Sequence, residues 1–176
     1  ANFLQLLYGA IDLLVVGQFC STAAVSAVST GSQVMKTITG IITGLATGAT
    51  VLVGQYIGAN KKDDAAKTVG ATVALFAVVA VILTAIMLLL ATQVALIMQA
   101  PQEAFDQTVE YIFICSAGII FIVGYNAVSS ILRGMGDSTS PMIFVIVATA
   151  INVGLDLLFV AVLDMKAAGA AYATII

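Results

Sequence analysis

Long runs of apolar residues, each broken by a short polar connection, dominate this chain. A transmembrane helix needs roughly 20 mostly apolar residues. On this measure the sequence predicts five full membrane spans and the start of a sixth. Their expected ranges are 2–19, 32–57, 68–99, 109–132, 141–163 and a truncated 167–176. No charged residue occurs from Thr68 to Gln102, so we expect one long tilted helix there rather than two spans with a turn.

The composition supports an integral membrane protein. Hydrophobic residues make up 61% of the chain and charged residues 9%, whereas a soluble domain has about 25% charged residues. The predicted fold class is therefore all-α, a transmembrane helix bundle. The net charge is −3 and no basic patch occurs, so we expect no binding to nucleic acid. Histidine is absent and no group of metal ligands stands out, which argues against a metal site and against an enzyme.

The basic residues of the connections predict the orientation. Lys61, Lys62, Lys67 and Arg133 lie in the connections after spans two and four, and the connections after spans three and five are mainly acidic. Because basic connections stay in the cytoplasm, we expect the amino end inside. The predicted location is the cell membrane (inner or plasma), which the chain crosses several times.

Two carboxylates lie inside predicted spans, where an acid at the centre costs about 2.5–3.5 kcal/mol. Asp12 shares a helix face with Gln5 and Tyr8, which precede it by seven and four residues. Asp156 follows Asn152 by four residues, again on one face. A polar stripe on an apolar helix is expected to face protein or water rather than lipid.

Asn126, in the fourth predicted span, completes the candidate site. We expect Asp12, Asn126, Asn152 and Asp156 to form one polar cluster inside the bundle. Such a cluster could take up and release a proton or hold a cation. The alternative is a polar clamp between helices, which contributes on average only about 0.6 kcal/mol in a membrane protein.

Glycine recurs at a fixed interval in the second predicted span. Gly40, Gly44 and Gly48 form a double small-xxx-small pattern. Small residues at this spacing let helix backbones approach closely. We therefore expect these three glycines to serve in helix packing.

Several stretches together resemble one transporter family. They are IDLLVVGQF, GQYIGANKKDDAAK, SSILRGMGDSTSPM, INVGLDLLFV and MKAAGAAYATII, and they cover nearly the whole chain in order. This series is similar to the MATE family of multidrug and toxic compound extrusion transporters. The resemblance implies a twelve-helix protein of two six-helix lobes. The chain would be the amino-terminal lobe, residues 1–176, with the second lobe absent.

The resemblance also implies a function and a site. Members of this family export bulky, often cationic organic compounds in exchange for H⁺ or Na⁺ by alternating access, and need no cofactor beyond that ion. The ion-binding cavity would use Asp12, Asn126, Asn152 and Asp156, and it would also be lined by Tyr8 and Thr174. The expected partners are the organic substrate, membrane lipid and the carboxy-terminal lobe.

Two other functions remain open from the sequence. A flippase for lipid-linked or polysaccharide substrates would share the architecture, but Arg133 and Lys166 lie at membrane ends and form no basic ring for a phosphate head. A membrane scaffold or the anchor subunit of an enzyme complex would tolerate Asn at both acidic positions.

Overall fold

Nearly every residue from 13 to 175, the range that the structure (a computed structural model) describes, lies in a helix, and none lies in a strand. Residues 13–19 form the end of a first helix. The helices that follow are α2 (Thr22–Gly58), α3 (Lys62–Ile97), a short 3-10 helix η1 (Gln102–Ala104), α4 (Phe105–Ala117), α5 (Ile119–Gly134), α6 (Thr139–Asp156), the π-helical segment η2 (Leu157–Val162) and α7 (Lys166–Ile175).

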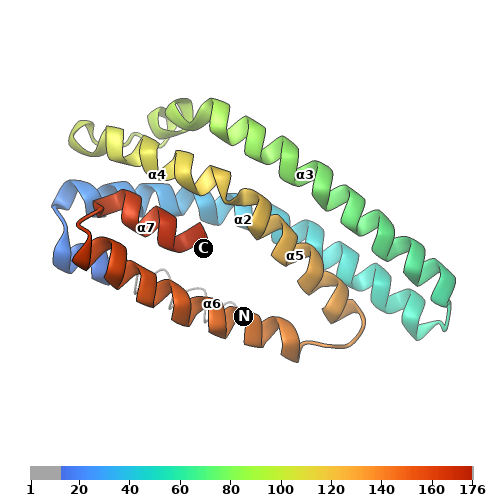
Figure 1. Cartoon of the computed structure of the whole chain (residues 1–176). Coiled ribbons are helices and arrows are strands. Elements are labelled where there is room, and N and C mark those ends of the chain that lie inside the picture. The colour runs from blue at the N-terminus through green and yellow to red at the C-terminus, as the bar shows by residue number, and fades with distance from the viewer. Residues whose placement is uncertain (1–12, 176) are drawn as a thin grey trace.

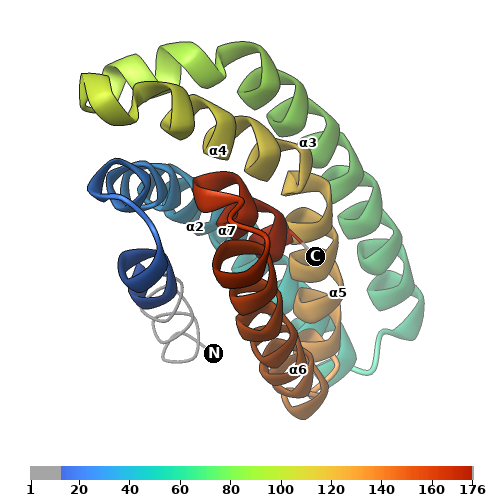
Figure 2. The same cartoon turned by 60° about the vertical axis from the view of Figure 1, so that its left-hand side comes forward.

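The helices run back and forth between two ends of the bundle (Figure 1). We call the end with the α2–α3 and α5–α6 connections the basic end, because Lys61, Lys62 and Arg133 lie there. The opposite end, with the α3–α4 and η2–α7 connections, is called the acidic end. Figures 1 and 2 both place α5 between α3 and α6. Helix α2 is central to the bundle, since it contacts α3, α4, α5 and α7.

Glycine allows the closest helix contacts of the bundle. Gly31 of α2 lies against the ring of Tyr111 on α4, and a Cβ atom at Gly31 would overlap that ring. Gly134 ends α5 against α2, where a Cβ atom would lie 2.8 Å from the Cβ of Val53 and 2.9 Å from the carbonyl oxygen of Thr50. These contacts leave no space for any side chain, so glycine is required for the observed spacing.

A bend separates α4 from α5. The two helices meet at Gly118 with an angle of 44° and together are long and apolar enough for one broken span. Gly118 is buried against Ile175 of α7, and its N–H donates to the carbonyl of Cys115 at 3.0 Å, as in a 3-10 turn. The sequence predicted one span across this region but not its bend, because a single glycine in an apolar run is common in membrane helices.

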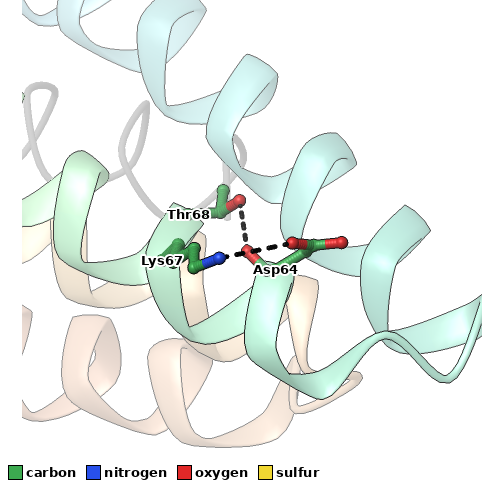
Figure 3. Close-up of polar contacts among 3 residues, drawn as sticks. All are labelled: Asp64, Lys67 and Thr68. Atoms are coloured by element: carbon green, nitrogen blue, oxygen red, sulfur yellow. Dashed lines mark hydrogen bonds and ion pairs between the residues drawn. The ribbon is translucent and has the colours of Figure 1, made fainter.

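Local hydrogen bonds fix the ends of the long helices. Ser21 caps α2 by accepting a hydrogen bond from the N–H of Ala24 at 3.4 Å. Figure 3 shows the first turns of α3, where Thr68 donates to the carbonyl of Asp64 at 2.8 Å and the Lys67 ammonium lies 3.9 Å from the Asp64 carboxylate. Asp64 also lies favourably near the positive end of the helix dipole. The exposed ion pair itself adds little stability.

Two connections lie close together at the acidic end. Burial raises the pKa of the Cys20 thiol, nearby Asp164 raises this pKa further, and Lys166 lowers it. The turn after the first helix therefore lies near the η2–α7 connection. Asp164 and Lys166 both have positive φ, 50° and 51°, which non-glycine residues rarely adopt. The η2–α7 connection is thus a tight, strained turn.

The observed helices agree with the predicted class and extend past several predicted limits. By length and composition, three described helices could cross a membrane, or four if the bent pair counts as one span. These four correspond to the expected ranges 32–57, 68–99, 109–132 and 141–163; most of the range 2–19 lies outside the described residues. Helix α2 begins at Thr22, well before Ser32. Its 37 residues span about 55 Å, more than the roughly 30 Å hydrocarbon layer.

The glycines expected to pack helices together make no such contact among the described residues. A Cβ atom at Gly40, Gly44 or Gly48 would have no heavy atom within 4 Å there. The described close contacts instead use Gly31, Gly118, Gly134 and Gly169. Helix packing by Gly40, Gly44 and Gly48 stays a prediction about partners outside the described residues.

This contrast gives a matched stability test. In Gly134→Ala the added methyl group meets Val53 and the backbone of Thr50, and overpacking of this kind costs about 1–3 kcal/mol. In Gly44→Ala the methyl group meets no heavy atom of the described residues within 4 Å, and the helix gains roughly 0.5–1 kcal/mol of intrinsic preference. We expect a lower thermal midpoint for the first variant and an equal or higher one for the second, measured on the intact protein in detergent. Equal midpoints would contradict the close α2–α5 contact.

Candidate functional site

Helix α6 turns its polar residues inward and its apolar residues outward. Its buried residues are Pro141, Asn152 and Asp156, with Asn152 5% exposed and Asp156 0% exposed. Large apolar side chains of the same helix, such as Phe144 and Val147, are exposed. This is the reverse of a water-soluble helix and fits a helix that faces lipid on one side. The inner face of α6 is therefore a polar site held inside the bundle.

Asp156 lies where α6 changes its winding. The next six residues form the π-helical segment η2, in which the N–H of Leu163 donates to the carbonyl of Leu158 at 3.0 Å. Short π-helical turns are rare and occur often at functional sites. Gly169 of α7 lies against η2, where a Cβ atom would come within 3.1 Å of the carbonyl carbon of Phe159. The segment after Asp156 is thus packed directly against α7.

Asn126 connects α5 to α2 through a hydrogen bond with Thr43. Its side chain is 7% exposed, and its Nδ2 donates to the carbonyl of Ile122 at 2.8 Å. Its Oδ1 accepts a hydrogen bond from Thr43 Oγ1 of α2 at 3.4 Å. The single cluster stays a prediction, since Asp12 lies outside the described residues. Asn152 and Asp156 share one face of α6, and Asn126 pairs with Thr43.

Of the other predicted site residues, only Thr174 lies in the described part of the chain. Thr174, on α7, is half-buried and its hydroxyl donates to the carbonyl of Ala170 at 2.8 Å. Thr174 and Asp156 each lie roughly 10 Å from the acidic end, counted along α7 and η2. Gln5, Tyr8 and Asp12 lie outside the described residues. Their place in the cavity stays a prediction.

A polar stripe on α2 was not recognised from the sequence. It consists of small and polar residues that are all exposed and recur every three or four positions: Ser29, Gln33, Lys36, Thr37, Gly40, Thr43, Gly44, Thr47 and Gly48. The opposite face of α2 carries the buried core residues Val28, Ile38 and Ile42. The signal was present in the sequence, since Thr and Gln follow the same spacing as the glycines. Thr43 links this stripe to buried Asn126.

The cavity found in the described part of the chain lies elsewhere. It has a volume of about 490 Å³ and lies between α3 and α4, where Leu88, Phe113, Asp106 and Glu110 are among the lining residues. None of the predicted site residues lines it. This pocket is therefore separate from the candidate site, whose described part is the buried polar face of α6.

Asp137 fixes the start of α6 and so helps to position Asp156. Its Oδ1 accepts hydrogen bonds from the N–H groups of Thr139 and Ser140, both at 3.0 Å, and its Oδ2 accepts one from Ser140 Oγ at 2.6 Å. These bonds satisfy donors at the helix start. The hydrogen bond from the Ser140 hydroxyl is the main reason that the pKa of Asp137 lies below its ordinary value.

The lowered pKa predicts how this cap responds to pH. A carboxylate with a lowered pKa stabilises the folded state above its ordinary pKa, about 3.9, and loses this contribution as the pH falls through the folded-state value. Asp137→Ala should therefore lower the thermal midpoint at neutral pH, and the difference from the unmodified protein should shrink towards about pH 3. Thermal unfolding of both proteins across this range measures it. A difference that stays constant with pH would contradict the role of the ionised carboxylate.

Comparison with known proteins identifies the fold. Residues 1–158 match the MatE family. The chain is 30% identical over 175 residues to the probable multidrug resistance protein YpnP of Bacillus subtilis, which covers 99% of this chain and 39% of YpnP. It is 28% identical over 179 residues to the probable multidrug resistance protein NorM of Thermotoga maritima, covering 99% of this chain and 38% of NorM.

Solved structures give the same result. A crystal structure of a MATE protein in a bent conformation superposes with a TM-score of 0.91 at 30% identity, over 98% of this chain and 38% of that one. A MOP superfamily transporter from Pyrococcus furiosus, described as having a binding pocket of reversed polarity, gives a TM-score of 0.91 at 29% identity, over 99% of this chain and 38% of the other. The chain thus spans less than half the length of these relatives, as one lobe of a two-lobe protein would.

Proposed function

This chain belongs to the MatE family, and from that premise we propose that the intact protein exports bulky organic compounds, often cationic, in exchange for H⁺ or Na⁺. One observation carries the proposal. Helix α6 turns a fully buried carboxyl, Asp156, and the amide of Asn152 into the lobe while its apolar side chains face outward. An intramembrane acid of this kind is by default a site for protons or ions.

Orientation follows from the charges of the connections. Lys61, Lys62, Lys67 and Arg133 all lie towards the basic end. Because basic connections are retained in the cytoplasm, the basic end faces the cytoplasm and the acidic end faces outward. The protein then lies in the plasma membrane with its amino end inside.

The polar stripe of α2 supplies one wall of the substrate path. It is exposed along most of a helix that is longer than the hydrocarbon layer is thick, and it contains hydroxyl, amide and glycine positions instead of large apolar side chains. A second lobe, which the relatives' length implies, would supply the facing wall. Rocking of two such lobes exposes a central path to either side in turn, as is usual for transporters built from repeats.

Coupling requires only that the ion and the organic compound favour different states of the protein. A ligand shifts a conformational equilibrium by as much as its affinities for the two states differ. Binding of H⁺ or Na⁺ at Asp156 neutralises the buried carboxylate, and this changes how α6 packs in the lobe. The compound leaves when the ion is bound and binds again when the ion is released.

Replacing the buried acid tests this coupling. We expect Asp156→Asn to keep the fold, because Asn has nearly the same shape, but to abolish ion exchange. The intact protein in weak buffer is mixed with a cationic dye, and the pH is followed. Proton release in the unmodified protein and its loss in Asp156→Asn support proton coupling. Asp164→Asn, at an exposed position of the acidic end, is the control and should behave like the unmodified protein.

The same variants distinguish the two ions. If no proton is released, dye affinity is measured with and without Na⁺. A Na⁺ effect that disappears only in Asp156→Asn supports sodium coupling. If neither ion affects dye binding through Asp156, that carboxyl is a structural clamp and the proposed function is wrong.

A further inference from the structure

Ser129 of α5 has a buried hydroxyl that no described residue satisfies. Its side chain is 1% exposed, and its Oγ has no hydrogen-bond partner in the part of the chain that the structure describes. Thr84 Oγ1 of α3 is also unsatisfied among the described residues, but the serines nearest to Ser129 in sequence or in burial bond to a carbonyl of their own helix. Ser130 donates to Ala127 at 2.7 Å, and Ser116 donates to Ile112. A buried polar group without a protein partner commonly indicates a bound water molecule.

Ser129 belongs to a polar face of α5 that reaches the basic end. It follows Tyr125 by four residues and Asn126 by three, and Arg133 follows it by four, so helical spacing places all four on one side. The Tyr125 hydroxyl donates to the carbonyl of Pro141 at 3.2 Å and so connects α5 to the first turn of α6. Ser129 therefore lies between the side of α5 that meets α6 through Tyr125 and the side that meets α2 through Asn126.

The inner face of α6 carries a matching set of positions. Pro141, Val145, Thr149, Asn152 and Asp156 recur every three or four residues, and each is buried or half-buried. Asp156 is the one acid among these five positions and lies farthest from the basic end. Thr149 lies between Asp156 and that end. Counted along the helices, Ser129 and Val145 both lie roughly 8 Å from the basic end. At this level, α6 contributes the aliphatic side chain of Val145 and α5 contributes the hydroxyl of Ser129.

We propose that the α5–α6 interface holds a water-filled proton path from Asp156 to the basic end, and that the Ser129 hydroxyl binds a water molecule of this path. The inference rests on the proposed exchange function with H⁺ as the ion. The O–H bond of the Asp156 carboxylic acid breaks, the carboxylate keeps the electron pair, and the proton passes to a water molecule. That water gives a proton to the next, so that one proton leaves at the basic end and nothing is oxidised or reduced.

Among the described residues, few other titratable groups lie on these faces of α5 and α6. Tyr125 and Arg133 are those on α5, and Asp137 is the one at the start of α6. Between Asp137 and Asp156, α6 carries no titratable side chain. A proton that leaves Asp156 towards the basic end therefore has no intermediate acid or base on α6, and it needs water. The Ser129 hydroxyl, which can donate and accept, is suited to orient that water.

Adjacent serines provide a matched pair for the test. Ser129→Ala removes the unsatisfied hydroxyl, and Ser130→Ala removes a hydroxyl of the same size that is already bonded within α5. Ser129→Thr keeps a hydroxyl and serves as the rescue variant. The intact protein is mixed rapidly with a cationic dye in weak buffer, and a pH indicator reports the amount and the rate of proton release. Thermal midpoints confirm that all variants are folded.

The expected result is equal proton release in all variants, with a rate several-fold lower in Ser129→Ala alone and restored in Ser129→Thr. Equal rates in Ser129→Ala and the unmodified protein would overturn the path and leave the proposed function intact. Equal slowing in both alanine variants would also overturn it, because it would indicate a general disturbance of α5. No proton release from the unmodified protein would refute proton coupling, and the path with it.

Discussion

The buried carboxyl of Asp156 is the constraint on which the arrangement of this lobe depends. A polar group in hydrocarbon costs several kcal/mol unless the protein surrounds it. Helix α6 contributes few apolar side chains to the core and presents most of them outward. Its rotation is therefore set by the need to keep Asn152 and Asp156 inside. The Asp137 cap at one end of α6 and the contact of η2 with Gly169 at the other hold it along its length.

Helix α2, unlike α6, packs into the core with one face and exposes a polar face on its other side. One face packs against α4 and α5 through Gly31 and through the contacts of Val53 and Thr50 with Gly134. The other face carries exposed hydroxyl, amide and glycine positions along most of the helix. Thr43 lies at the boundary, since it is exposed and also donates to buried Asn126. The same helix thus builds the core of the lobe and a polar surface beside it.

The sequence predicted the helical class and the long helices well, because apolar length alone identifies a membrane helix. It also predicted that Asn152 and Asp156 face inward together, and both are buried on one side of α6, while their role in ion binding stays a prediction. It did not predict the bend at Gly118, which depends on Ile175 of α7, far away in the chain. It assigned close packing to Gly40, Gly44 and Gly48, because spacing reveals a small face but not what lies opposite. Ser129 was missed because a single serine resembles any helix-bonded hydroxyl, and only the structure reveals that its hydroxyl has no partner among residues 13–175.

The two kinds of packing in this lobe respond differently to charge. Contacts among α2, α4 and α5 are close, with glycine against a ring or a backbone, and the polar ones, such as Thr43 with Asn126 and Ser32 with Tyr111, join uncharged groups. Helix α6 is held by polar groups, so a change of charge at Asp156 alters the free energy of its docking directly. The π-helical segment that follows Asp156 has i→i+5 hydrogen bonds, such as that of Leu163 with Leu158, and segments of this kind occur often at functional sites. If ion binding at Asp156 changes how α6 docks while the contacts among α2, α4 and α5 persist, α6 could move without unfolding the lobe.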